Sequence, residues 1–169
     1  MPIPVVTIIG KSGSGKTTLM EALIPELSRR GYRIATVKHH SHSGFEVDQP
    51  GKDSWRHARA GSVHVIISAP DKIASYRPLK AELALAEIVP EVREADLILV
   101  ERYKQAGYPT LEVLRSEVSL ELIGMPEQRF AVAADIPMAI GVPCFGLDDI
   151  TGISDLIEEL FLNRSEANP

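Results

Sequence analysis

The sequence predicts an α/β fold in which helices flank a mostly parallel β-sheet. Short apolar runs rich in β-branched residues recur along the chain, and such runs are typical of strands buried on both faces of a sheet. The first two runs, at residues 4–9 and 33–38, are separated by apolar residues at helical spacing. A strand–helix–strand unit naturally places its two strands parallel. The length of 169 residues suits one domain, which we expect to cover residues 1–169.

The periodicity predicts the remaining elements in chain order. The first helix is expected over residues 19–27 and ends before Gly31, a common helix stop. A long polar loop occupies residues 39–52, after which Asp53 is expected to cap a short helix. Beyond this helix we expect buried strands at 63–69, 96–100 and 130–134, a short strand at 73–76, and helices at 80–89 and 154–162.

A marginal β ribbon is expected over residues 110–123. Residues 117–123 alternate, with Val118, Leu120 and Leu122 on one face, and such alternation marks a half-buried strand. The run at 110–114 is similar though less regular. Exposed strand edges invite pairing with a second chain, so this ribbon predicts a homodimer. A ribbon folded back on its own domain is the alternative.

The composition excludes several classes of protein. The formal net charge is −5 and the isoelectric point about 5.5, whereas a surface that binds nucleic acid duplexes normally carries a basic excess. The single cysteine, Cys144, cannot form an intramolecular disulfide, which fits a reducing compartment. The apolar run from Ile3 to Ile9 is too short for a membrane helix or a signal peptide. We therefore expect a cytoplasmic protein with no nucleic-acid or membrane partner.

The segment after the first predicted strand matches the Walker A pattern G-x-x-x-x-G-K-[ST] at every fixed position. Its glycines let the backbone curl around an anion, and successive N–H groups then point inward at the positive end of the next helix. Lys16 can reach the terminal phosphates, and the Thr17 hydroxyl can bind Mg²⁺. The flanking strand and helix predict a P-loop NTPase-like fold that binds a nucleoside triphosphate through Gly10, Ser12, Gly13, Ser14, Gly15, Lys16, Thr17 and Thr18.

A P-loop site also needs a carboxylate at the end of a nearby strand to hold Mg²⁺ or to orient water. Glu101 ends the apolar run at 96–100 and is the best placed candidate, while Asp48 and Asp53 lie in or beside the long polar loop. Asp135 follows the strand at 130–134, where a carboxylate could accept hydrogen bonds from guanine. A turn residue is the alternative for Asp135, and the usual N-K-x-D base-reading motif is absent.

Lys38, His39, His40 and His42 crowd the start of the polar loop. Their spacing matches no zinc pattern, so a surface that binds an anion is the better functional interpretation, with a solvated loop as the alternative.

The run from Thr36 to Gly61, together with the P-loop and residues 99–104, closely resembles the MobB family of molybdopterin-guanine dinucleotide biosynthesis adapter proteins. The resemblance covers most of the chain. It implies a dimeric, GTP-binding P-loop protein that assists the guanylyltransferase attaching GMP to molybdopterin, with molybdopterin or its carrier enzyme as a further partner. It also implies that Asp48 and Glu101 are catalytic and that Thr17, Asp48 and Glu101 bind Mg²⁺.

The chain departs from the family pattern after the strand that ends at Glu101. The family usually has glycine at the next position, where this chain has Arg102. Glycine allows a positive φ at little cost, whereas arginine adopts one less readily. The conformation of this loop is therefore open.

Three functions are compatible with the sequence: a GTP-binding adapter with slow hydrolysis, a P-loop small-molecule kinase, and a non-catalytic module whose nucleotide orders a loop. A kinase normally needs a mobile lid with several arginines, whereas the segment 102–108 offers only Arg102 and Lys104 as cations. We therefore favour the adapter, and measured turnover separates it from the non-catalytic module.

Overall fold

A computed structural model describes residues 2–40, 44–104 and 106–163 of the chain. The chain divides into two compact units, one formed by residues 1–39 and 84–169 and the other by residues 40–83. A single domain over residues 1–169 stays a prediction. No helix in the described parts of the chain is long and apolar enough to cross a membrane.

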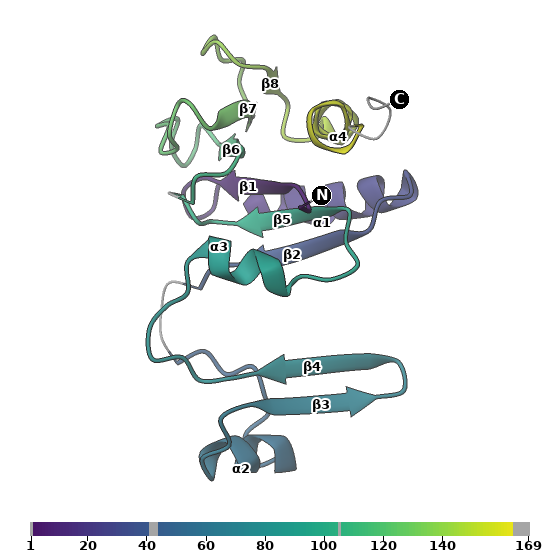
Figure 1. Ribbon diagram of the computed structural model, residues 1–169. Helices are drawn as coiled ribbons and strands as arrows, with labels where there is room; N and C mark the ends of the chain where they lie inside the picture. The colour runs from purple at the N-terminus through teal and green to yellow at the C-terminus, as the bar shows by residue number, and fades with distance from the viewer. Residues whose placement is uncertain (1, 41–43, 105, 164–169) are drawn as a thin grey trace. The chain divides into compact units, whose positions relative to one another are not determined.

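The first unit contains a six-stranded, wholly parallel sheet with the order β2-β5-β1-β6-β7-β8 (Figure 1). This architecture confirms the predicted α/β class. The strands are β1 (Val5–Ile9), β2 (Ile34–Lys38), β5 (Leu97–Glu101), β6 (Thr110–Leu114), β7 (Arg129–Ala134) and β8 (Cys144–Phe145).

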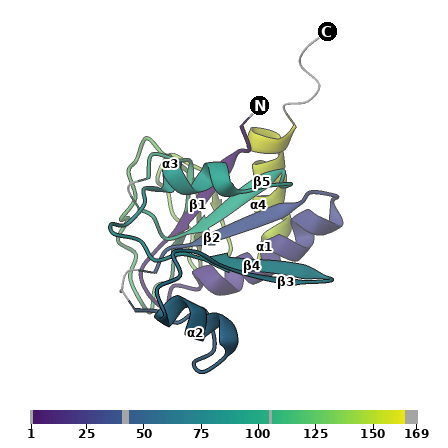
Figure 2. The ribbon, with the colours of Figure 1, turned by 60° about the horizontal axis from the view of Figure 1, so that its bottom comes forward.

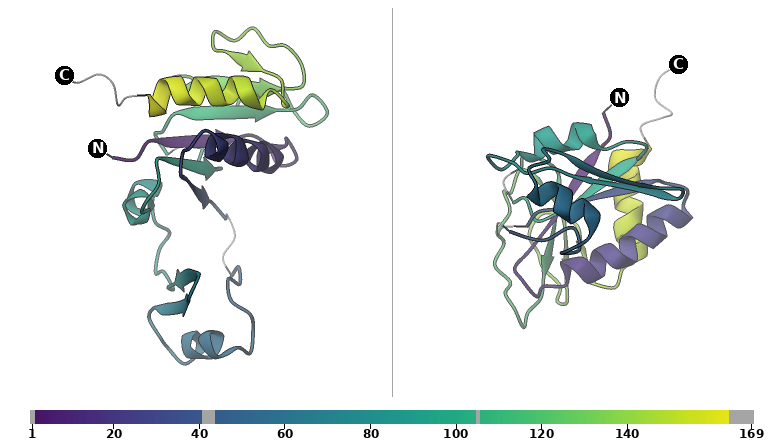
Figure 3. Two further views of the ribbon diagram at one scale, coloured as in Figure 1. Left: turned by 90° about the vertical axis from the view of Figure 1, so that its right-hand side faces the viewer. Right: turned by 90° about the horizontal axis from the view of Figure 1, so that it is seen from below.

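Helices cover the two faces of this sheet because alternate strand residues point to opposite sides. Helices α1 (Lys16–Arg29) and α4 (Ile150–Ile157) pack on one face, where buried side chains such as Leu23 and Ile153 meet those of β1, β5, β6 and β7 (Figure 2). A short π-helix, Glu158–Leu162, continues α4. The other face is covered near β5 by α3 (Leu85–Ile88) and the 3₁₀ helix Val89–Glu91 (Figure 3).

The β ribbon predicted over residues 110–123 is wrong. Residues 110–114 form β6, which lies inside the sheet between β1 and β7 with every residue buried. Residues 117–123 form no strand, apart from an isolated bridge between Arg115 and Ser119. In the run at 110–114 the alternation arose from Glu112, a polar residue whose side chain is nevertheless fully buried against Arg129. A homodimer stays a prediction, but the edge of a ribbon at 110–123 no longer supports it.

The second unit consists of α2 (Asp53–Arg59) and an antiparallel hairpin of β3 (Val65–Ala69) and β4 (Lys72–Tyr76). The helix begins at Asp53 with Lys52 as its N-cap, so the predicted capping role of Asp53 is wrong. The strand at 63–69 was expected to be buried, yet only Val65 of β3 is buried. An apolar run does not reveal whether other parts of the structure pack against it. In this unit several large apolar side chains are exposed, namely Val63, Ile66, Ile67 and Ile73.

Candidate nucleotide-binding site

The predicted site residues of the first unit gather at the carboxyl edge of the parallel sheet. The P-loop follows β1, Lys38 ends β2 and Glu101 ends β5. Glu101 is in register with Ile8 of β1 on one side and with Lys38 on the other. Ligands of open α/β sheets bind at this edge, because the loops that follow parallel strands meet there.

The P-loop backbone has the conformation that an anion cradle requires. Gly13 and Gly15 adopt positive φ values of 82° and 99°, which glycine reaches without steric cost. Gly10 packs so closely on β6 that a Cβ there would lie 2.3 Å from the carbonyl oxygen of Val113. Ser12, Gly13, Thr17 and Thr18 are exposed and accessible to a ligand, whereas Ser14 is buried.

Lys16 lies buried within the loop, where its Nζ donates a hydrogen bond to the carbonyl oxygen of Lys11 at 2.7 Å. Burial lowers the pKa of the Lys16 ammonium below its usual value, and the nearby cation Arg102 lowers it further. Lys104 and Lys38 act in the same direction, whereas the Glu101 carboxylate opposes them. This excess of positive charge around a buried ammonium favours binding of an anion, since an anion restores the stability of the charged form.

Thr17 and Glu101 lie together, as the Mg²⁺ prediction requires. The Thr17 hydroxyl donates to Glu101 Oε1 at 3.3 Å, and Lys38 Nζ lies 3.3 Å from Glu101 Oε2. A hydroxyl and a carboxylate are hard oxygen ligands that suit Mg²⁺ shared with phosphate oxygens. Their metal-binding and catalytic roles stay predictions.

Asp48 belongs to the second unit, whereas Glu101 belongs to the first. Its carboxylate accepts hydrogen bonds from the Tyr76 hydroxyl and the backbone N–H of Gln49, both at 2.8 Å. Hydrogen bonds from the Ser54 side chain and from Tyr76 hold the pKa of Asp48 below its usual value. Asp48 is therefore an ionised acceptor, and its catalytic and metal-binding assignment stays a prediction.

Asp135 lies directly after β7, at the same edge of the sheet as the P-loop. Its carboxylate accepts hydrogen bonds from the hydroxyl of Ser116 at 2.7 Å and from its backbone N–H at 2.8 Å. These bonds keep the pKa of Asp135 below its usual value. The side chain remains exposed, so guanine recognition by Asp135 stays a prediction.

The histidines of the polar loop contact aromatic rings. The His39 ring lies 4.5 Å from that of Tyr103, and the His40 ring 5.4 Å from that of Phe45. Within the described residues, no group of three or more His, Cys, Asp or Glu side chains is placed to hold a metal ion. His42 lies outside the described residues.

Comparison with known proteins decides the family. The family described as "Molybdopterin guanine dinucleotide synthesis protein B" matches residues 5–135. The chain belongs to the MobB family. A relative named "Molybdopterin-guanine dinucleotide biosynthesis adapter protein" from Haemophilus influenzae is 39% identical over 158 residues, covering 92% of this chain and 88% of the relative. The Escherichia coli protein of the same name is 32% identical over 163 residues, with 93% of each chain covered.

Solved MobB structures share the fold. The crystal structure of Bacillus subtilis MobB has a TM-score of 0.75 and 26% identity, covering 93% of this chain and 97% of that chain. A crystal structure of molybdopterin-guanine biosynthesis protein B has a TM-score of 0.72 and 29% identity, covering 92% of this chain and 99% of that chain. These similarities confirm the MobB resemblance and the α/β fold predicted from the sequence.

The loop after β5 shows how this MobB chain accommodates arginine at the usual glycine position. Arg102 has a φ of 79° and Tyr103 a φ of 42°, so both adopt left-handed backbone conformations. The Arg102 N–H donates to the carbonyl oxygen of Ile8 at 3.0 Å, which holds the loop beside β1. The arginine thus adopts a left-handed backbone conformation that glycine would adopt freely, at a conformational cost of about 1–2 kcal/mol.

Sequence reasoning missed the segment 115–124, which follows β6 and lies against the P-loop. Lys11 Nζ lies 2.5 Å from Glu121 Oε2, and a Cβ on Gly13 would lie 3.8 Å from Val118. The buried Glu112 carboxylate holds the far end of the segment by accepting hydrogen bonds from the N–H groups of Ile123 and Gly124. Walker A spacing carries no signal for these partners, because they are distant in the sequence.

Proposed function

We propose that this MobB-family chain acts in molybdopterin-guanine dinucleotide biosynthesis as an adapter that binds GTP with Mg²⁺. One observation carries the proposal: the Lys16 ammonium is buried in a glycine loop among other cations, beside the Thr17–Glu101 pair. A di- or triphosphate supplies the negative charge that this arrangement lacks, and the exposed Gly13 leaves its backbone open to it.

Each residue has a distinct part in this proposal. The N–H groups of Gly13 and Gly15 and the Lys16 ammonium bind phosphate oxygens, while Thr17 and Glu101 hold Mg²⁺. Bound Mg²⁺ supplies charge neutralisation at the phosphates. Asp135, already ionised at the carboxyl end of β7, accepts hydrogen bonds from guanine N1–H and N2–H₂.

Hydrolysis is expected to be slow, well below the typical enzyme turnover of about 10 s⁻¹. The Glu101 carboxylate is only 5% exposed and is already engaged by Thr17 and Lys38, so it is poorly placed to activate water. Slow turnover suits an adapter, in which the bound nucleotide serves to order the protein for its partner.

The proposed partners are the guanylyltransferase that attaches GMP to molybdopterin and molybdopterin or its carrier enzyme. The surface of α2 supports an anionic partner, because Arg56, His57 and Arg59 are exposed there. A cavity of about 530 Å³ is lined by these three residues together with Asp53, Trp55 and Ala60. Asp53 pairs with Arg56 at 3.5 Å, whereas the Arg59 guanidinium lies 5.3 Å from the centre of the Trp55 ring. An aromatic face beside cations suits a flat anionic ring system such as a pterin phosphate.

The homodimer is also part of the proposal, now placed on the β3–β4 hairpin. Ile66 is 58% exposed and Ile73 72% exposed, and within the described residues each strand of the hairpin pairs only with the other. An isolated two-stranded hairpin is at best marginally stable in water. We place a second copy of the chain on this hairpin, because a two-fold dimer lets the hairpins of both chains pack against each other in one self-complementary contact.

The variant Lys16→Ala tests the nucleotide site. Titration of fluorescent GTP in the presence of Mg²⁺ should show at least a tenfold loss of affinity, because a charge-assisted hydrogen bond to phosphate is worth roughly 1.5–3 kcal/mol. The exposed Lys80 provides the matched control, and Lys80→Ala should leave the affinity unchanged. Equal GTP affinity in Lys16→Ala and the native chain would exclude the P-loop as the binding site.

A further inference from the structure

Arg115 occupies a position beside the P-loop that the Walker A pattern does not include. It directly follows β6, and strand alternation places it on the same face as Leu111 and Val113, the face that α1 covers. A Cβ on Gly15 would lie 3.3 Å from Arg115 Nη2. The guanidinium therefore contacts the point where the P-loop becomes helix α1.

This environment is unfavourable for an isolated cation. The beginning of α1 carries the positive end of the helix dipole, which repels a nearby positive charge. The Nε atom of Arg115 is buried and has no hydrogen-bond partner. Throughout residues 2–40, 44–104 and 106–163, Arg115 forms no ion pair within 4.0 Å, and its charge makes only a minor contribution to the lowered pKa of the Asp135 carboxyl, after the hydrogen bonds from Ser116. An anion at the P-loop would relieve both features at once.

The backbone around Arg115 is held in place before any ligand binds. The Arg115 carbonyl oxygen accepts hydrogen bonds from the N–H groups of Val118 at 2.9 Å and Ser119 at 2.8 Å. The next residue, Ser116, is bound by the Asp135 carboxylate. Preorganisation of this kind lowers the entropy cost of forming a contact with a ligand.

We propose that Arg115 binds a phosphate group of the nucleotide from the β6 side of the P-loop. The guanidinium presents paired N–H donors that match phosphate oxygens, whereas Lys16 acts as a point charge within the loop. The inference rests on the proposed function insofar as the P-loop must hold a nucleotide. It adds a second phosphate-binding side chain, contributed by a strand outside the Walker A segment.

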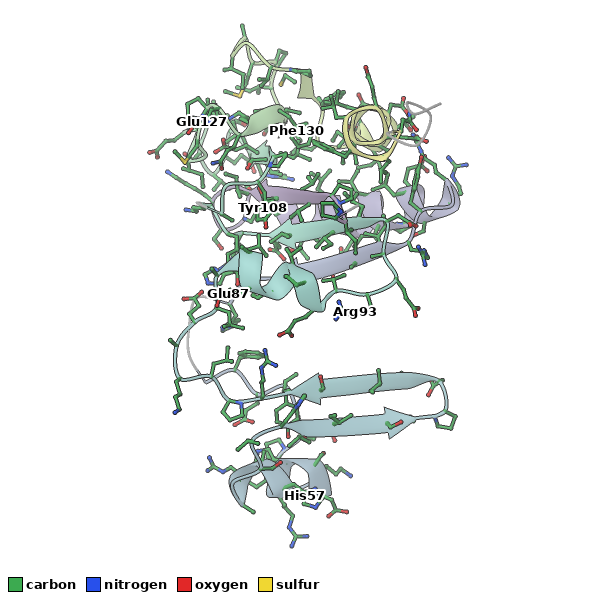
Figure 4. All side chains as sticks on the ribbon, in the orientation of Figure 1. His57, Glu87, Arg93, Tyr108, Glu127 and Phe130 are labelled. Atoms are coloured by element: carbon green, nitrogen blue, oxygen red, sulfur yellow. The ribbon has the colours of Figure 1, made fainter. Side chains whose placement is uncertain are left out.

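Two variants and two ligands test this role. Native chain, Arg115→Gln and Arg115→Lys are titrated with fluorescent GTP and, in competition, with inorganic tripolyphosphate, always with Mg²⁺. Arg115→Gln should weaken binding of both ligands about tenfold or more, and Arg115→Lys should recover part of the loss. Arg93→Gln is the matched control, because Arg93 is exposed and precedes β5 at the opposite edge of the sheet (Figure 4).

The outcomes separate this inference from the proposed function. Failure of the native chain to bind GTP overturns the proposed function itself. Loss of GTP binding in Lys16→Ala but not in Arg115→Gln leaves that function standing and overturns the role of Arg115. A loss for GTP without a loss for tripolyphosphate also overturns it, because Arg115 would then contact the base or the ribose.

A measurement on the native chain covers the case in which Arg115→Gln does not fold. The Nε–H resonance of Arg115, assigned by its disappearance in Arg115→Lys, should shift when tripolyphosphate and Mg²⁺ are added. An unchanged resonance at saturating tripolyphosphate would overturn the proposal.

Discussion

The variant Glu112→Gln should strongly destabilise the chain although Glu112 lies outside the P-loop. The Glu112 side chain is fully buried in β6, and its carboxylate accepts a hydrogen bond from Arg129 Nε at 2.8 Å. It also accepts from the N–H groups of Ile123 at 2.5 Å and Gly124 at 3.2 Å. Arg129 is itself only 7% exposed, so neutralising Glu112 leaves a buried guanidinium without its counter-charge.

The expected loss in the free energy of unfolding is about 3–5 kcal/mol, the usual cost of breaking one partner of a buried ion pair. A loss of 3 kcal/mol corresponds to a fall in melting temperature of about 6–12 °C for a chain of this size. Urea denaturation followed by circular dichroism measures the free energy directly. The control is Glu127→Gln, on the exposed loop before β7 (Figure 4), which should change stability by less than about 0.5 kcal/mol.

The double variant Glu112→Gln with Arg129→Met tests the reasoning. Once Glu112 is neutral, removing the guanidinium should cost little more, so the two losses should be clearly less than additive. A loss below about 1 kcal/mol for Glu112→Gln, or full additivity in the double variant, would refute the buried ion pair as the source of stability.

Three further changes have defined outcomes. Arg102→Gly should raise the free energy of unfolding by about 1 kcal/mol in urea denaturation, because glycine adopts the φ of 79° freely but adds freedom to the unfolded chain; a decrease would contradict the strain at this position. Asp96→Asn should remove about 1 kcal/mol at pH 7 after allowance for solvent screening, because hydrogen bonds from Arg33 lower the pKa of Asp96 to about 2. Since this folded-state pKa lies below the unfolded value of about 3.9, the difference from the native chain is complete above pH 4 and should vanish as the pH falls through about 2; a difference independent of pH would contradict it. Ile73→Lys should give folded monomers in analytical ultracentrifugation, whereas a folded dimer would place the interface away from the hairpin.

Local sequence determined the P-loop half of the candidate site. The P-loop needs only a strand, glycines at fixed spacing and a following helix, and all of these are adjacent in the chain. Glu101 was also predictable, because a polar residue that ends an apolar run lies at the carboxyl end of a buried strand. Register then brought it next to Thr17, although the two are distant in the sequence.

The position of β6 could not be determined locally. A buried glutamate gives the same alternation as a solvent-facing one, and only its contact with Arg129 distinguishes the two cases. For the β3–β4 hairpin the prediction failed in the other direction. Its apolar residues predicted buried strands, whereas most residues of both strands are exposed. The burial of Glu112 depends on a partner distant in the sequence, and the apolar residues of the hairpin are left exposed. Periodicity reports only the chemical character of each residue.

The sequence by itself therefore determined the parallel α/β class, the MobB family and the position of the Walker A loop, because these depend on short-range pattern and motif. Only the tertiary structure decided that the Glu112 carboxylate accepts hydrogen bonds from the end of the segment 115–124, beside the P-loop. It also decided that Arg115 lies against Gly15. The physical reason is that these contacts join residues of different strands and loops. Their geometry follows from strand order and packing, which no local pattern specifies.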